Sequence, residues 1–109
     1  MAISEERMEK ALAFLAETDS EYAERVGAVM RYEFMLEAAE ALAFKSSDAT
    51  SAEARKHDAR LAEPVKKAQE DLILATVERE RVKAQRKRAE ITIEAWRSLN
   101  ANRRVGNVQ

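Results

Sequence analysis

Apolar residues recur at helical spacing over two long stretches of the chain, and a short polar segment separates the stretches. The first stripe consists of Met8, Leu12, Leu15, Tyr22, Val26, Val29 and Leu36. The second advances by alternating steps of four and three residues and consists of Leu61, Val65, Ala68, Leu72, Ala75, Arg79, Val82, Arg86, Ala89, Ile93 and Trp96. These spacings predict two amphipathic helices, and the second has the heptad pattern of a coiled coil.

Capping residues indicate where the helices begin and end. Ser4 precedes acidic residues and predicts the first helix start, while Thr50 and Glu53 form a capping box that restarts the helix. The "TDSE" segment at 18–21 resembles another capping box, and we favour a continuous helix with a local weakness there. We therefore predict one domain over residues 1–109, with a helix at about 4–45, a turn at about 46–50, a helix at about 51–100 and a frayed tail at 101–109.

Pro64 lies inside the second stripe. Proline costs about 3 kcal/mol in a helix interior but is tolerated in a first turn. The second helix therefore either starts near Glu63 or is kinked there after a short lead-in helix.

The short connection makes the two helices antiparallel neighbours. With the turn centred near residue 48, Val29 faces Ala68 and Asp19 faces Arg79, so we predict an Asp19–Arg79 ion pair between the helices. The predicted fold is all-α, an antiparallel two-helix hairpin like a coiled coil.

A second group of apolar residues lies off both stripes: Met30, Phe34, Ala38, Ala41, Ile73, Val77 and Ile91. Apolar residues on more than one helix face indicate that hairpins pack together. We predict a homo-oligomer, either a dimer that forms a four-helix bundle or a larger assembly.

Composition supports long helices and gives no indication of a membrane or secreted protein. Charged residues make up 36% of the 109-residue chain, with two glycines, one proline and no cysteine. The first residues lack the apolar core of a signal peptide, and no uncharged run approaches the roughly 20 residues needed to span a bilayer. We expect a cytoplasmic protein with no membrane contact.

Residue types that usually carry catalysis are scarce. The lone histidine, His57, has Glu53 and Leu61 four residues away, so it lacks a second histidine for a helical zinc site. There is no cysteine nucleophile and no glycine-rich phosphate loop, and Gly27 is better explained by a close approach of two helices. We predict no enzyme activity, no metal and no cofactor.

Charge is divided unevenly along the chain. Residues 1–50 hold 11 acidic and five basic residues, whereas residues 51–109 hold nine acidic and 14 basic ones. Either the two halves pair with each other, or the basic half binds a polyanion such as nucleic acid. The candidate contacts for nucleic acid or a partner protein are Lys83, Arg86, Lys87, Arg88, Arg97, Arg103 and Arg104. Trp96 continues the second stripe and is a candidate core residue or interface anchor.

The ending "KRAEITIEAWRSLNANRR", with "LAETDSEYAERVGAV" and "SAEAR" before it, resembles a family of short all-helical proteins of tailed bacteriophages and prophages. The resemblance covers nearly the whole chain, and its sharpest part runs from Ala89 to Arg103. It carries no catalytic residues and implies an accessory role in phage DNA metabolism. The chain departs from the family pattern at "RLAEPVKK", where the family often has an aromatic residue.

The leading functional hypothesis is a non-catalytic phage interaction module, accessory to DNA replication or recombination through contacts with phage or host proteins. One alternative is a low-specificity nucleic-acid binder that uses the basic end of the second helix. Another is an inhibitor of a host enzyme or defence system.

Overall fold

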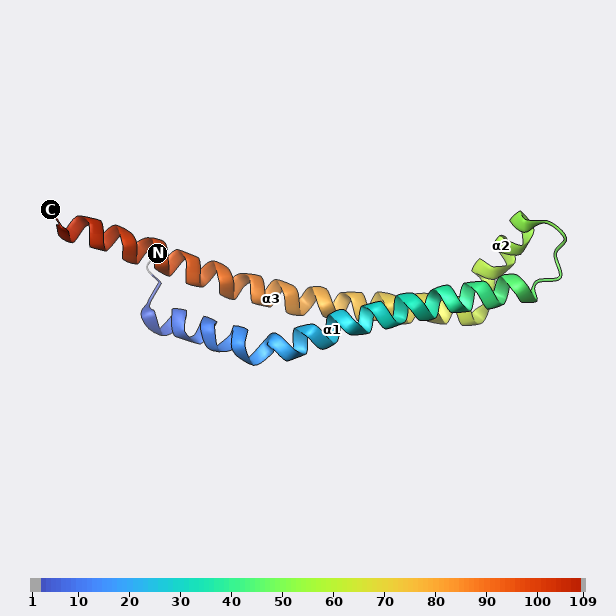
Figure 1. The fold of residues 1–109 in the computed structure, drawn as a ribbon, viewed down its shortest axis with the longest axis horizontal. Coiled ribbons are helices and arrows are strands. Elements are labelled where there is room, and N and C mark those ends of the chain that lie inside the picture. Colours follow the sequence, from blue (N-terminus) through green and yellow to red (C-terminus); the bar gives the residue numbers. More distant parts are fainter. Residues whose placement is uncertain (1–2, 109) are drawn as a thin grey trace. The chain divides into compact units, whose positions relative to one another are not determined.

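The computed structural model describes the backbone of residues 3–108 and the side chains of residues 3–103. It contains three helices, α1 (Glu5–Ser46), α2 (Ala52–Leu61) and α3 (Glu63–Val108), and the described backbone contains no strand (Figure 1). Helices α1 and α3 pack together, which confirms the prediction of an all-α protein.

Contacts divide the chain into two compact units. Unit 1 combines residues 1–23 with residues 80–109, and unit 2 comprises residues 24–79. Both α1 and α3 contribute to each unit. The division arises because a residue in a pair of long helices contacts only the residues opposite it, so no single core forms.

Helix α1 begins as the sequence predicts. The Arg7 amide donates to the Ser4 hydroxyl over 3.2 Å, and the Met8 amide donates to the Ser4 carbonyl over 3.1 Å. The helix continues through residues 18–21 without a break. There the Thr18 hydroxyl donates to the Phe14 carbonyl over 2.7 Å instead of capping a new helix.

The restart after α1 differs in detail from the prediction. Ser51, not Thr50, caps α2, because its hydroxyl accepts from the Ala54 amide over 3.1 Å. Helix α2 ends at Ala62, which is extended and accepts the first hydrogen bonds of α3 from Val65 and Lys66. Pro64 lies in the first turn of α3, where its missing amide proton costs nothing. The chain thus has both features anticipated at Pro64, a short lead-in helix and a new start at Glu63.

Side chains hold the connection between α1 and α2 in place. The Ser47 hydroxyl donates to Asp58 over 2.6 Å, and Arg55 Nε donates to the Ala49 carbonyl over 2.9 Å. The Arg55 guanidinium also lies over the Phe44 ring, 5.8 Å from its centroid. These contacts join residues from both helices and the segment between them.

Helix α3 continues to Val108, so the prediction of a frayed tail at 101–109 is wrong for its described part. No proline follows Pro64, and Ala101, Arg103 and Arg104 favour helix. Extending an existing helix fixes one residue for each new hydrogen bond, which is far easier than starting one. Loss of hydrophobic periodicity is therefore a poor indicator of a helix end.

Each unit has a small core. In unit 1, Met8, Ala11, Ala89 and Ile93 form a buried cluster, and Phe14, Leu15 and Trp96 pack against it. In unit 2 the buried apolar residues are Val29, Ala59 and Val65, and Val65 is 0% exposed.

The pairing of α1 with α3 is shifted from the prediction. Asp19 forms an ion pair with Arg86, over 2.6 Å, whereas the sequence register places Arg79 opposite it. Arg86 lies seven residues further along, which is one heptad and the same helix face. The shift arises because α2 and its flanking residues, not a simple turn, separate α1 from α3.

A substitution at Gly27 tests the stability of α1 through helix propensity alone, without contacts to another helix. A Cβ atom there would meet only the Arg31 side chain, at 3.5 Å, so the predicted close helix approach is wrong. We expect Gly27→Ala to raise the free energy of unfolding by about 1 kcal/mol, because alanine favours helix and the space is free. Urea denaturation would measure this, and a destabilised variant would show that the position needs glycine.

Candidate interaction surface

Helix periodicity places exposed apolar residues of α1 and α3 on one side of unit 2. Ala41 of α1 and Gln69 of α3 line the same groove. Phe34 lies seven residues before Ala41 and Ile73 lies four residues after Gln69, so both share that groove's side. Met30 lies four residues before Phe34 on α1, and Val77 lies four residues after Ile73 on α3. Both therefore continue the same helix faces. We call Met30, Phe34, Ile73 and Val77 the 30/73 face.

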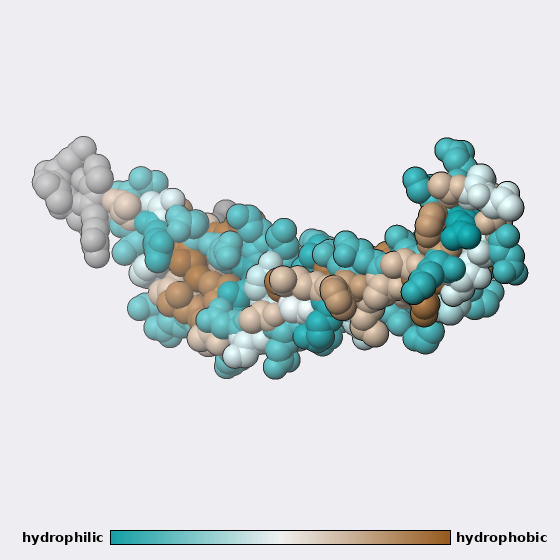
Figure 2. Space-filling view, turned by 45° about the vertical axis from the view of Figure 1, so that its right-hand side comes forward, coloured by the Kyte–Doolittle hydropathy of each residue, from teal (hydrophilic) through white to brown (hydrophobic). Residues whose placement is uncertain are grey.

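The 30/73 face is open to solvent. Phe34 is 71% exposed, Met30 65%, Ile73 57% and Val77 47%. Figure 2 shows apolar surface interrupting an otherwise hydrophilic exterior. Single exposed apolar residues are common, but a contiguous group that includes an aromatic ring indicates an interaction site.

Helix α2 bounds this side of unit 2 near the connection. Its residues Lys56, Ala59 and Arg60 line the groove opposite Glu37 and Glu40 of α1. Glu37 of α1 and Arg60 of α2 therefore line one groove. The charges of α2 and α1 form a polar border next to the apolar residues.

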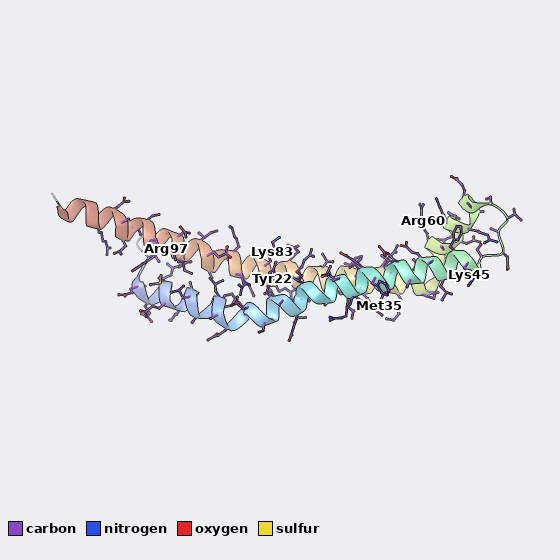
Figure 3. All side chains as sticks on the ribbon, in the orientation of Figure 1. Tyr22, Met35, Lys45, Arg60, Lys83 and Arg97 are labelled. Carbon is purple, nitrogen blue, oxygen red and sulfur yellow. The ribbon has the colours of Figure 1, made fainter. Side chains whose placement is uncertain are left out.

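The opposite side of unit 2 also carries exposed apolar residues, since Met35 is 54%, Leu74 59% and Leu42 66% exposed. Ala28, Tyr32, Asp71 and Ala75 line a groove there, together with Arg25, Arg31, Leu74 and Glu78. Asp71 accepts a hydrogen bond from Lys67 over 2.9 Å, which raises the pKa of that lysine above its ordinary value. By the same helix periodicity Met35, labelled on α1 in Figure 3, and Leu42 belong to this opposite side, which makes them natural controls.

In unit 1, Arg86 joins α3 to α1. Its side chain is only 17% exposed. Nη1 donates to the Leu15 carbonyl over 2.8 Å and to the Thr18 hydroxyl over 2.7 Å, and Nη2 donates to Asp19 over 2.6 Å. The guanidinium also lies 5.5 Å from the centroid of the Tyr22 ring. Arg86 is thus a structural residue and is not available to a polyanion.

The remaining basic candidates are spread over the surface of unit 1. Lys87 pairs with Glu90 over 3.8 Å, and Arg97 pairs with Glu94 over 3.0 Å. Lys83 lines a groove beside Tyr22, and both are labelled in Figure 3. Arg88 lines another groove with Arg7 and Lys10, and Arg103 is exposed. The Arg104 side chain lies outside the described residues. The structure thus distributes the basic residues and places acidic partners beside two of them.

Trp96 packs against the buried cluster of unit 1, with Phe14 and Leu15 as neighbouring partly buried residues. It contributes to the core at this end of the helix pair. A role as an interface anchor stays a prediction.

The described residues lack the features of a metal site or a membrane span. His57 is exposed, and no group of three or more histidine, cysteine, aspartate or glutamate residues there could hold a metal ion. No described helix combines the length and the apolar character needed to cross a membrane. Buried residues among those described are all apolar.

Comparisons with known proteins found no match among protein-family models, curated proteins or solved structures. The resemblance to phage proteins therefore stays a prediction.

One feature of these surfaces could have been predicted from the sequence, and one could not. Arg79 and Arg86 interrupt an otherwise apolar stripe, and a basic residue at such a position indicates a partner on the facing helix. The polar border formed by α2 could not be predicted from the sequence pattern, because its position depends on the extended backbone at Ala62.

Proposed function

We propose that the protein is a non-catalytic helical interaction module whose 30/73 face packs against helices of another polypeptide. The observation that carries the proposal is the exposure of Met30, Phe34, Ile73 and Val77 on one side of unit 2. Covering these side chains would contribute on the order of 5 kcal/mol before the costs of association. Four exposed apolar side chains without such a partner would be a solubility liability.

A non-catalytic role is supported by the kind of surface that the chain offers. Catalytic carboxylates and lysines act in closed sites that perturb their protonation. The described charged residues instead lie on exposed or partly exposed helix faces, in ion pairs along one helix or in contacts between α1 and α3. Such charges keep a helical surface soluble and orient its partners.

Within that role, we propose a phage-encoded module that is accessory to DNA replication or recombination. The support for this part is the resemblance of the ending from Ala89 to Arg103. We prefer protein contacts to direct nucleic-acid binding, because Arg86 is engaged with α1 and Lys87 and Arg97 lie beside glutamates. A polyanion site would need several free cations in one place.

Site-specific photo-crosslinking tests the interaction module. A photoreactive phenylalanine analogue at position 34 should yield a discrete protein adduct when the full chain is produced in its native cells. The same analogue at position 35, on the opposite side of α1, is the matched control and should yield little of that adduct. Equal yields at both positions, or no adduct at position 34, would contradict the proposal.

A further inference from the structure

The 30/73 face fits a second copy of this chain. We propose that two hairpins pair through this face in a two-fold symmetric four-helix bundle, so that α1 of each copy lies against α3 of the other. This inference rests on the proposed function and names its partner.

The residues of the face are complementary in size. Helix α1 contributes Met30 and Phe34, which are long or aromatic, and α3 contributes Ile73 and Val77, which are branched and shorter. A two-fold axis parallel to the helices keeps every residue at its own level along the bundle, so it brings Met30 of one copy against Ile73 of the other and Phe34 beside Gln69. A two-fold interface requires this self-complementarity, because the same surface is used by both copies.

The exposed area is on the scale that a dimer needs. At their exposed fractions of 47–71%, the four side chains present roughly 500 Å², taking about 150–250 Å² for a large apolar or aromatic residue. Standard interfaces bury about 800 Å² per partner. Glu37, Ala41, Lys66 and Gln69 lie on the same side and supply the polar rim and the remaining area.

The small core of unit 2 explains why the partner is a second copy. Unit 2 buries only Val29, Ala59 and Val65 among its described apolar residues, and it leaves more large apolar residues exposed than buried. A pair of helices with so few buried residues is marginally stable. A second copy is present wherever the chain is made and covers this face. Folding of unit 2 then requires no other protein.

Sedimentation velocity of the full chain over the micromolar range tests the pairing. The natural chain should sediment as a dimer. Phe34→Glu should raise the dimer Kd about 100-fold, because it places a charge at the centre of an apolar interface. Met35→Glu, on the opposite side of α1, should leave the Kd nearly unchanged. Circular dichroism should show equal helix content in both variants. Ile73→Lys, a substitution on α3, should raise the dimer Kd as Phe34→Glu does.

Single-cysteine variants test the geometry, since the chain has no cysteine of its own. A mixture of Met30→Cys and Ile73→Cys chains should form mixed disulfide dimers on mild oxidation. A mixture of Arg31→Cys and Leu74→Cys, which line one groove on the opposite side, should form few.

The outcomes separate this inference from the proposed function. A natural chain that stays monomeric, or a dimer broken by Met35→Glu but not by Phe34→Glu, would overturn pairing through the 30/73 face. The photo-crosslink then decides whether the interaction module survives. An adduct of the chain with a different protein keeps the proposed function, and the absence of any adduct at position 34 removes it.

Discussion

Val65→Asp should destabilise the protein by about 4 kcal/mol, a large part of the 5–15 kcal/mol that stabilises a typical domain. Val65 is the one large side chain among the described residues that is fully buried, with 0% exposure. It lies in the first turn of α3, and its amide donates to the Ala62 carbonyl between α2 and α3. An aspartate there would either bury its carboxyl group without a hydrogen-bond partner or disrupt the local packing to reach solvent.

The urea midpoint from far-ultraviolet circular dichroism measures this effect, with Val65→Ala as an intermediate step. Val65→Ala removes apolar volume without adding charge and should cost about 2 kcal/mol. Leu42→Asp is the matched control, because Leu42 is 66% exposed, and we expect it to cost less than 1 kcal/mol. If Val65→Asp and Leu42→Asp had similar midpoints, Val65 would not be a buried core residue.

Arg86→Ala should lower the free energy of unfolding by about 2 kcal/mol. The substitution removes charge-assisted hydrogen bonds to Leu15, Thr18 and Asp19 and the contact with the Tyr22 ring. Little of this loss comes from the ion pair itself, because Asp19 is 69% exposed and solvent screens its charge. Asp19→Ala should therefore cost less than 1 kcal/mol.

Thermal and urea denaturation of Arg86→Ala, Arg86→Lys and Lys87→Ala would check this prediction. Lysine cannot reproduce the planar set of donors, so Arg86→Lys should recover only part of the stability. Lys87 is exposed and pairs within its own helix, so Lys87→Ala should be nearly neutral. Equal stabilities for Arg86→Ala and Lys87→Ala would show that Arg86 does not join the helices.

The role of Arg86 also changes how nucleic-acid binding should be tested. A variant that replaces Arg86, Lys87 and Arg88 together would lose DNA affinity through instability as well as through charge. Lys83→Ala with Arg88→Ala removes exposed cations and leaves the contacts with α1 intact. DNA binding that survives this variant would not depend on the central basic residues of α3.

The apolar pattern predicted the helices and their faces because helix formation depends on residues three and four positions apart. Ser4 predicted the start of α1, and the exposure of Met30, Phe34 and Ile73 agrees with their place off the main stripe. The pattern predicted the pairing of the helices less well. Arg79 and Arg86 are one heptad apart on the same face, so either could lie opposite Asp19, and only the length of the connection distinguishes them.

The sequence by itself determined that this protein is helical, where its first helix starts and which residues stay outside its narrow core. Each of these depends on local spacing, capping chemistry and the free energy of burying apolar side chains. Only the tertiary structure decided that α2 and α3 are two helices and not one kinked helix, and that Arg86 pairs with Asp19. These features depend on the extended backbone at Ala62 and on how far α3 is displaced along α1, and neither is encoded in a periodic pattern.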